Sequence, residues 1–230
     1  FMRLESATRV ALGGLFGSLS AVAILLAPAA LGGEGWSTAV AWEFGRWLYI
    51  PAALFWFCVL PLWLWRRWPM PGVLGGLLTG LVVLLPALLA VVQLRQLGAL
   101  ALLALMAIVW VADITAYFAG RAFGKRKLAP SISPGKTWAG AYGAVAGVVG
   151  YGMAASTIVD LPGPAVLIPV LVLLTVLSIV GDLFESLLKR QADIKDSSNV
   201  LPGHGGVLDR IDSLTSTLPL IALGWLLGGV

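Results

Sequence analysis

The sequence predicts an all-α integral membrane protein: a polytopic transmembrane helical bundle of about seven spans, with two substantial cytoplasmic loops. Hydrophobic residues make up 59% of the 230 residues and charged residues only 11%, whereas an ordinary soluble domain has about 25% charged residues. The chain is divided into long uncharged runs, and most of them approach the roughly 20 residues that a helix needs to cross a bilayer. Lys and Arg are concentrated in alternate connections between these runs.

The uncharged runs place the predicted spans. They cover residues 10–33, 47–65, 68–94, 96–112, 137–159, 161–181 and 213–230. The first run is longer than the 7–15-residue apolar core of a secretory signal, so we interpret it as a span. We expect a single integral membrane domain over residues 1–230, with N-terminal spans in 1–95 and the catalytic half in 96–230. The single cysteine, Cys58, excludes an intramolecular disulfide.

The basic residues predict the orientation. If the N-terminus is cytoplasmic, 13 of the 15 Lys and Arg residues lie in inner segments, and only Arg46 and Arg95 lie outside. The positive-inside rule therefore places the N-terminus and both polar loops in the cytoplasm. Because the placement of the basic residues explains the net charge of +4, we expect no nucleic-acid partner. Tryptophans at the ends of the second and third spans are expected to be interfacial anchors; they are Trp47, Trp63, Trp65 and Trp68.

The densest polar segment follows the sixth predicted span. Residues 182–212 hold six of the eleven acidic residues and four of the fifteen basic ones. Asp182, Ser186 and Lys189 stand at positions i, i+4 and i+7, so they share one face of a helix. A carboxylate, a hydroxyl and an ammonium in a row suit a phosphate bridged by a cation. The alternative is an ordinary helix end with an inner Lys-Arg pair.

A glycine-rich stretch lies within the same segment and includes the only histidine, His204, beside Gly205 and Gly206. Glycines allow backbone N–H groups to approach a phosphate closely. Asp209 follows this stretch and could complete a metal site begun by Asp182, because Mg²⁺ is usually held by one or two carboxylates plus substrate phosphates. For His204 a loop-ordering hydrogen bond or a phosphate contact is favoured over general-base chemistry.

Two further sites are singled out upstream. Asp113 lies in an apolar segment, where an ionisable residue is costly and therefore a functional candidate; the alternative is a structural hydrogen bond to a neighbouring helix. The Gly-Lys-Thr at 135–137 suggests a P-loop, but that motif needs a glycine where this chain has Pro130. We reject the P-loop and predict a phosphate-contacting turn that uses Ser133, Lys136 and Thr137.

These residues together resemble a known family. The pattern Ser186-x-Leu188-Lys189-Arg190, four residues, Lys195-Asp196-x-Ser198, two residues, Leu201-Pro202-x-His204-Gly205-Gly206-Val207-x-Asp209-Arg210-Ile211-Asp212 is similar to the signature of phosphatidate cytidylyltransferases, also called CDP-diacylglycerol synthases. Upstream, Asp113-x-x-Ala116-Tyr117-Phe118-x-Gly120 and Ser133-Pro134-x-Lys136-Thr137 resemble further stretches of this family. The likeness covers the C-terminal half of the chain.

The resemblance implies that CTP and phosphatidic acid react to give CDP-diacylglycerol and pyrophosphate, with Mg²⁺ required. It also implies a homodimer in the bacterial inner membrane. The residues implied to hold Mg²⁺ are Asp182 and Asp209. Those assigned to the attacking lipid phosphate or the α-phosphate are Ser186, Lys189 and Arg190. Those assigned to the departing pyrophosphate are Lys195, Gly205, Gly206 and Arg210.

The remaining assignments are supporting ones. Asp196 and Asp212 either orient basic side chains or hold a second cation. Ser133 and Lys136 close the site from the other loop, and Asp113 supports a polar cleft that opens toward the bilayer. Two other functions are weighed: a CTP-dependent polyprenol or phytol kinase, which would transfer the γ-phosphate, and an ion-coupled secondary transporter. A transporter is disfavoured because the charges crowd one inner face rather than the midplane.

Overall fold

The structure is a computed structural model that describes residue 17 and residues 38–70, 72–198 and 206–228. In chain order, its described elements are α3 (Thr38–Leu54), the π-helical turn η1 (Phe55–Val59), α4 (Leu60–Arg66), α5 (Gly72–Leu94), the 3₁₀ turn η2 (Arg95–Leu97), α6 (Ala99–Phe123), β1 (Lys127–Ala129), β2 (Ser133–Thr137), α7 (Trp138–Ala155), α8 (Pro164–Gln191) and α9 (Leu208–Leu227). The prediction of a helical membrane protein is confirmed. The described strands form one antiparallel hairpin, β1–β2, which pairs Lys127 with Thr137.

Four helical segments of the described chain are long and apolar enough to cross a membrane: Trp42–Arg66, Gly72–Leu97, Ala99–Phe123 and Pro164–Gln191. The predicted spans 137–159 and 213–230 correspond to α7 and α9, which are helical but do not reach the same mean hydropathy. Glycines dilute α7, and serines and threonines dilute α9. The predicted span 10–33 lies outside the described residues, so the count of seven spans stays a prediction.

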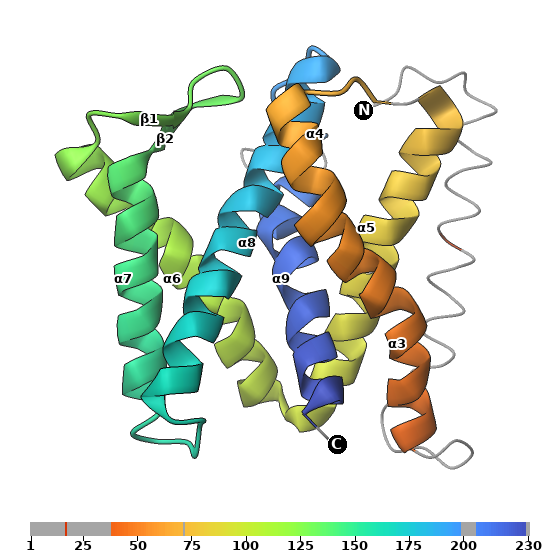
Figure 1. Cartoon of the computed structure of the whole chain (residues 1–230), viewed down its shortest axis with the longest axis vertical. Helices are drawn as coiled ribbons and strands as arrows, with labels where there is room; N and C mark the ends of the chain where they lie inside the picture. Colours follow the sequence, from red (N-terminus) through yellow and green to blue (C-terminus); the bar gives the residue numbers. More distant parts are fainter. Residues whose placement is uncertain (1–16, 18–37, 71, 199–205, 229–230) are drawn as a thin grey trace.

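The helices place the polar segments at one end of the molecule. α8 and α9 lie centrally, with α7 on one side and α3 and α5 on the other (Figure 1). The hairpin β1–β2, the C-terminal end of α8 and the start of α9 all lie at the same end (Figure 1). Segments that are far apart in the sequence, 121–136 on one side and 182–198 with 206–212 on the other, are therefore brought to one end of the bundle.

Small residues allow the helices that carry the site to approach closely. A Cβ atom at Gly143 of α7 would overlap Ala119 of α6, and one at Gly147 would overlap Thr115. A Cβ atom at Gly181 of α8 would lie 2.6 Å from the Ser216 hydroxyl of α9. Close backbone approach through small residues is the usual way in which membrane helices associate.

Buried hydroxyl groups join α8 to α9 at this contact. The Ser213 hydroxyl donates a hydrogen bond to the Ser178 carbonyl at 3.1 Å, and the Ser216 hydroxyl donates to the Leu177 carbonyl at 2.8 Å. Both serines are buried, so each bond satisfies a polar group that could not reach water. These bonds fix the N-terminal half of α9 against the middle of α8.

An aromatic cluster fixes α8 from the other side. The Phe184 ring makes edge-to-face contacts with Phe55 and Trp63, at centroid distances of 5.6 and 5.5 Å. Trp63 is only 5% exposed, so its prediction as an interfacial anchor is wrong. Its indole N–H donates to the Trp68 carbonyl at 2.7 Å, which allows the ring to be buried between helices. Trp47 and Trp65 remain exposed, as anchors require.

Candidate active site

A polar cavity of about 540 Å³ lies where α6, the hairpin, α7 and α8 meet. Three charged side chains predicted from the sequence line it from three different elements: Asp113 from α6, Lys136 from β2 and Asp182 from α8. Tyr117 and Arg121 extend this wall along α6, and the Arg121 guanidinium donates to the Tyr117 hydroxyl at 3.1 Å. The cavity therefore joins residues that the sequence places far apart.

Asp182 is held from two sides. The Lys136 ammonium lies 2.6 Å from one carboxylate oxygen, and the Ser186 hydroxyl donates to the other at 3.3 Å. Ser186 reaches Asp182 because it stands one helical turn further along α8. The predicted shared face of these two residues is confirmed. Lys136 also donates to the Ile179 carbonyl at 3.3 Å, so the hairpin is tied to α8 through one lysine.

Negative charge accumulates around Lys136. Burial, together with the nearby Asp182 carboxylate, raises the pKa of Asp212 to about 6, and Asp113 contributes in the same direction. Lys136 opposes this shift. Asp113 of α6 and Asp182 of α8 thus both act on Asp212 of α9. Arg121 and Lys127 also line the cavity and add positive charge to it. Carboxylate oxygens gathered from three helices suit a hard divalent cation.

Asp209 stands at the centre of a separate network. One carboxylate oxygen lies 2.8 Å from the Lys189 ammonium. The other accepts hydrogen bonds from the Gly206 N–H at 2.7 Å, the Ser197 N–H at 2.9 Å and the Ser197 hydroxyl at 2.8 Å. Burial alone would raise the pKa of Asp209, but the donors, led by Lys189, outweigh it and hold the pKa well below its usual range. Asp209 therefore joins α8, the connection after it and the start of α9.

Lys189 has a second carboxylate partner. Glu185, one turn earlier on α8, lies 2.8 Å from the Lys189 ammonium. The side chain of Glu185 is only 5% exposed and that of Lys189 16%. Glu185 was not among the site residues predicted from the sequence. Its position four residues before Lys189 was the available signal, because oppositely charged residues at this spacing pair on a helix.

The structure gives the two predicted metal ligands different partners. Asp182 contacts Lys136 and Ser186, whereas Asp209 contacts Lys189, Ser197 and Gly206. In the described part of the chain, no three Asp, Glu, His or Cys side chains form a metal-binding group. A cation at this site would therefore draw the rest of its ligands from substrate phosphates and water, as Mg²⁺ commonly does.

The segment 133–137 is a strand and not the predicted turn. Thr137 is buried, and its hydroxyl accepts a hydrogen bond from the Gly140 N–H at 3.1 Å, which caps the N-terminus of α7. This capping accounts for a threonine directly before a helix. Ser133 is half-buried on the same strand. The prediction of a turn was wrong because a short polar segment with Gly and Pro carries no local sign that it pairs with another strand.

The remaining predicted residues lie around this core. Gly206 is buried, and its N–H is bound to Asp209. The side chains that lie exposed are those of Arg190, Lys195, Asp196 and Arg210. His204 and Gly205 lie outside the described residues.

Comparison with known proteins adds an independent result. The model of the cytidylyltransferase family matches residues 3–226. A phosphatidate cytidylyltransferase of Pseudomonas aeruginosa is 47% identical over 169 residues, which cover 71% of this chain and 59% of that protein.

Two further curated proteins with the same name show a comparable likeness. The protein of Brucella abortus is 50% identical over 116 residues, covering 50% of this chain and 43% of that protein. The protein of Haemophilus influenzae is 48% identical over 120 residues, covering 50% of this chain and 42% of that protein. The matches thus span between about two fifths and three fifths of the length of these relatives.

Proposed function

The chain belongs to the cytidylyltransferase family, and on this premise we propose that it transfers the cytidylyl group of CTP to phosphatidic acid, giving CDP-diacylglycerol and pyrophosphate. The observation that carries the proposal is the meeting of Asp113, Lys136 and Asp182 in one polar cavity at an end of apolar helices. A site there can receive a nucleotide from water and a lipid headgroup from the bilayer. The relatives named phosphatidate cytidylyltransferase support the choice of these two substrates.

The reaction depends more on alignment of the two substrates and neutralisation of phosphate charge than on proton transfer. An oxygen of the lipid phosphate attacks the α-phosphorus of CTP, and the bond between the α-phosphorus and the bridging oxygen to the β-phosphate breaks. The lipid phosphate is already an anionic nucleophile, so no strong base is needed. Fixed positive charges and hydrogen-bond donors are the groups that accelerate such a transfer.

The described residues can supply these groups. We assign Lys136, Ser186 and Lys189 to phosphate oxygens, because each is held in a fixed position by a carboxylate partner. Arg190, Lys195 and Arg210 are exposed beside this core and would meet the phosphates of the incoming nucleotide. Ser133 and Asp196 would support these basic side chains from the edge of the site. Asp113 would orient bound groups at the side of the cavity that α6 forms.

Magnesium fits the donor set. Asp182 lines the cavity, and its charge raises the pKa of Asp212, so we assign these two carboxylates to the ion, while Asp209 is held in its own network. When bound, Mg²⁺ would neutralise charge on the triphosphate. This assignment replaces Asp209 by Asp212 as the second ligand, since Asp209 already accepts bonds from Lys189, Ser197 and Gly206.

The test is a product analysis with purified protein in detergent, phosphatidic acid, Mg²⁺ and CTP. One arm uses CTP labelled at the α-phosphate and a second arm uses CTP labelled at the γ-phosphate. We expect the α-label to enter the lipid fraction and the γ-label to appear in pyrophosphate. Transfer of the γ-label to lipid would instead identify a CTP-dependent lipid kinase, and no labelled lipid in either arm would refute the proposal.

We also propose that the protein is a homodimer in the inner membrane of a bacterium, with the site facing the cytoplasm. The gathering of the basic hairpin and the polar end of α8 at one end of the bundle supports this orientation (Figure 1). Labelling of cysteines introduced one at a time at position 125 and at position 95 of a Cys58→Ser variant, with a membrane-impermeant reagent in intact cells, tests it. Position 95 should react and position 125 should not.

A further inference from the structure

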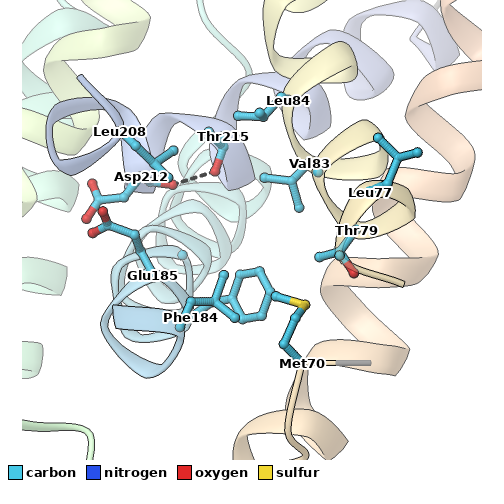
Figure 2. A pocket seen from close by; sticks show the side chains of 14 residues that line it. Met70, Leu77, Thr79, Val83, Leu84, Phe184, Glu185, Leu208, Asp212 and Thr215 are labelled. Atoms are coloured by element: carbon cyan, nitrogen blue, oxygen red, sulfur yellow. Dashed lines mark hydrogen bonds between the residues drawn. The ribbon is translucent and has the colours of Figure 1, made fainter. Parts of the chain in front are cut away.

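A second, smaller cavity of about 190 Å³ lies between α5, α8 and α9. Its walls are mostly apolar and include Val83, Phe184 and Leu188. Two carboxylates stand at one side of it, and Figure 2 shows Glu185 of α8 and Asp212 of α9 directed toward one another. Asp212 belongs to the acidic cluster described above, but Glu185 has no role in the proposed reaction so far.

Glu185 is an unexpected residue for its surroundings. It is 4% exposed, and neither carboxylate oxygen has a hydrogen bond of good geometry among the described residues. Its charged neighbours include the Lys189 ammonium, which lies 2.8 Å away, and the Asp209 carboxylate. Burying a carboxylate with so few partners is unfavourable, and an apolar residue of similar size would pack at least as well. Packing therefore does not account for a glutamate at this position.

The ion pair itself offers an account. An ammonium has three N–H donors. The Lys189 ammonium donates one hydrogen bond to Asp209 at 2.8 Å, and it forms an ion pair with Glu185, also at 2.8 Å. Glu185 lies on the same helix and Asp209 on α9, so the two carboxylates hold the ammonium between helices. A lysine stem is flexible, and two anchors restrict it to one position.

We propose that Glu185 is a positioning residue for the cytidylyl transfer: it holds the Lys189 ammonium against Asp209 and leaves the third N–H directed to a substrate phosphate. The expected effect of Glu185 on turnover rests on the proposed function. Its geometric part, the placement of Lys189, concerns the protein alone and can be measured without substrates.

Two variants test the proposal. Glu185→Gln keeps the shape and removes the charge, and Glu185→Met replaces the carboxylate by an apolar side chain. We expect both to lower kcat by about tenfold or more, with the KM for CTP changed by less than about threefold, because misplacement of a group affects the transition state most. The melting temperature of Glu185→Met should equal or exceed that of the wild type. A purely structural glutamate would instead lose activity in step with stability.

The matched control is Glu43→Gln. Glu43 also pairs with a basic residue on its own helix, Arg46, at 2.9 Å, but the Glu43 side chain is 56% exposed. In the sequence, Glu43 lies far from the residues that line the cavity. This variant should retain wild-type kcat and melting temperature. If Glu185→Gln behaves like Glu43→Gln, with kcat unchanged, the proposal is overturned.

A second measurement is independent of turnover. Purified wild type and both Glu185 variants are treated with an amine-acylating reagent, and modification of Lys189 is followed by mass spectrometry against the exposed Lys125. We expect the rate at Lys189 to rise several-fold in the variants, and an unchanged rate would contradict the proposal. If the wild type makes no CDP-lipid but Lys189 becomes more reactive in the variants, the proposed function fails while the positioning role stands.

Discussion

The Lys136 ammonium on the hairpin lies 2.6 Å from the Asp182 carboxylate on α8. This ion pair connects the basic loop to the acidic end of α8, and both residues line the polar cavity. Asp113 and Asp212 add their charges to the same surroundings. Lys136 thus restrains the hairpin and also supplies the positive charge that faces three carboxylates.

Replacement of Lys136 should therefore remove activity. Lys136→Met should lower kcat for labelled CDP-lipid formation by about 100-fold, the usual scale for loss of one fixed electrostatic contact in a transfer reaction. Lys125→Met is the matched control, since Lys125 lies before the same hairpin but is exposed and does not line the cavity. Equal activity of the two variants would contradict the role of Lys136.

Asp209→Asn should be both inactive and less stable. The substitution removes the negative charge and one of the two acceptor oxygens, so the amide cannot accept from Lys189 on one side and from Ser197 and Gly206 on the other. Breaking a largely buried ion pair costs about 3 kcal/mol. Thermal unfolding in detergent, followed by circular dichroism, should show a lower melting temperature than for the wild type. An inactive variant with wild-type stability would mean that Asp209 acts on substrate and not on the fold.

The stability that Asp209 provides should depend on pH. Its pKa in the folded protein is depressed, so its contribution is present above the unfolded-state pKa of about 3.9 and is lost as pH falls from there toward the folded-state pKa. With a chelator present, the gap in melting temperature between wild type and Asp209→Asn should be constant from about pH 5 to 8 and shrink below about pH 4. A gap in melting temperature that widens as the pH falls would contradict this prediction.

Close packing of α6 and α7 should be required for the cavity that they line. Gly143→Leu would drive a side chain into Ala119, whereas a Cβ atom at Gly150 on the same helix would have no neighbouring atom within 4 Å. We expect Gly143→Leu to destabilise the protein by about 1–3 kcal/mol, as overpacking usually does, and to lower activity. Gly150→Leu should change neither. Comparable melting temperatures for the two variants would refute the packing argument.

Chelation of divalent cations should abolish transfer and leave the fold intact. The gathering of Asp113, Asp182 and Asp212 near Lys136 is the reason to expect a cation there. Excess EDTA should stop labelled lipid formation, added Mg²⁺ should restore it, and the far-ultraviolet circular dichroism should not change. Turnover that continues in excess chelator would show that the reaction does not require Mg²⁺.

Several features could be predicted from local sequence. The apolar runs located the described helices, and the helical spacing of Asp182 and Ser186 correctly placed them in contact. The signature residues between Ser186 and Asp212 led to the family that the comparison supports. Boundaries were less accurate: the fourth span was predicted to end at residue 112, but α6 continues to Phe123, because a helix can carry polar residues beyond the bilayer without breaking.

The uncharged runs by themselves determined that this is a helical membrane protein, since hydropathy and helical period act over neighbouring residues. The residue pattern 186–212 determined the resemblance to the cytidylyltransferase family. Only the tertiary structure decided that Lys136 meets Asp182, that Lys189 lies between Glu185 and Asp209, and that Trp63 is buried. Such pairings depend on how closely helices approach through residues such as Gly143 and Gly181. Side chains on different helices meet only after that packing is set, and no local pattern encodes the distance between them.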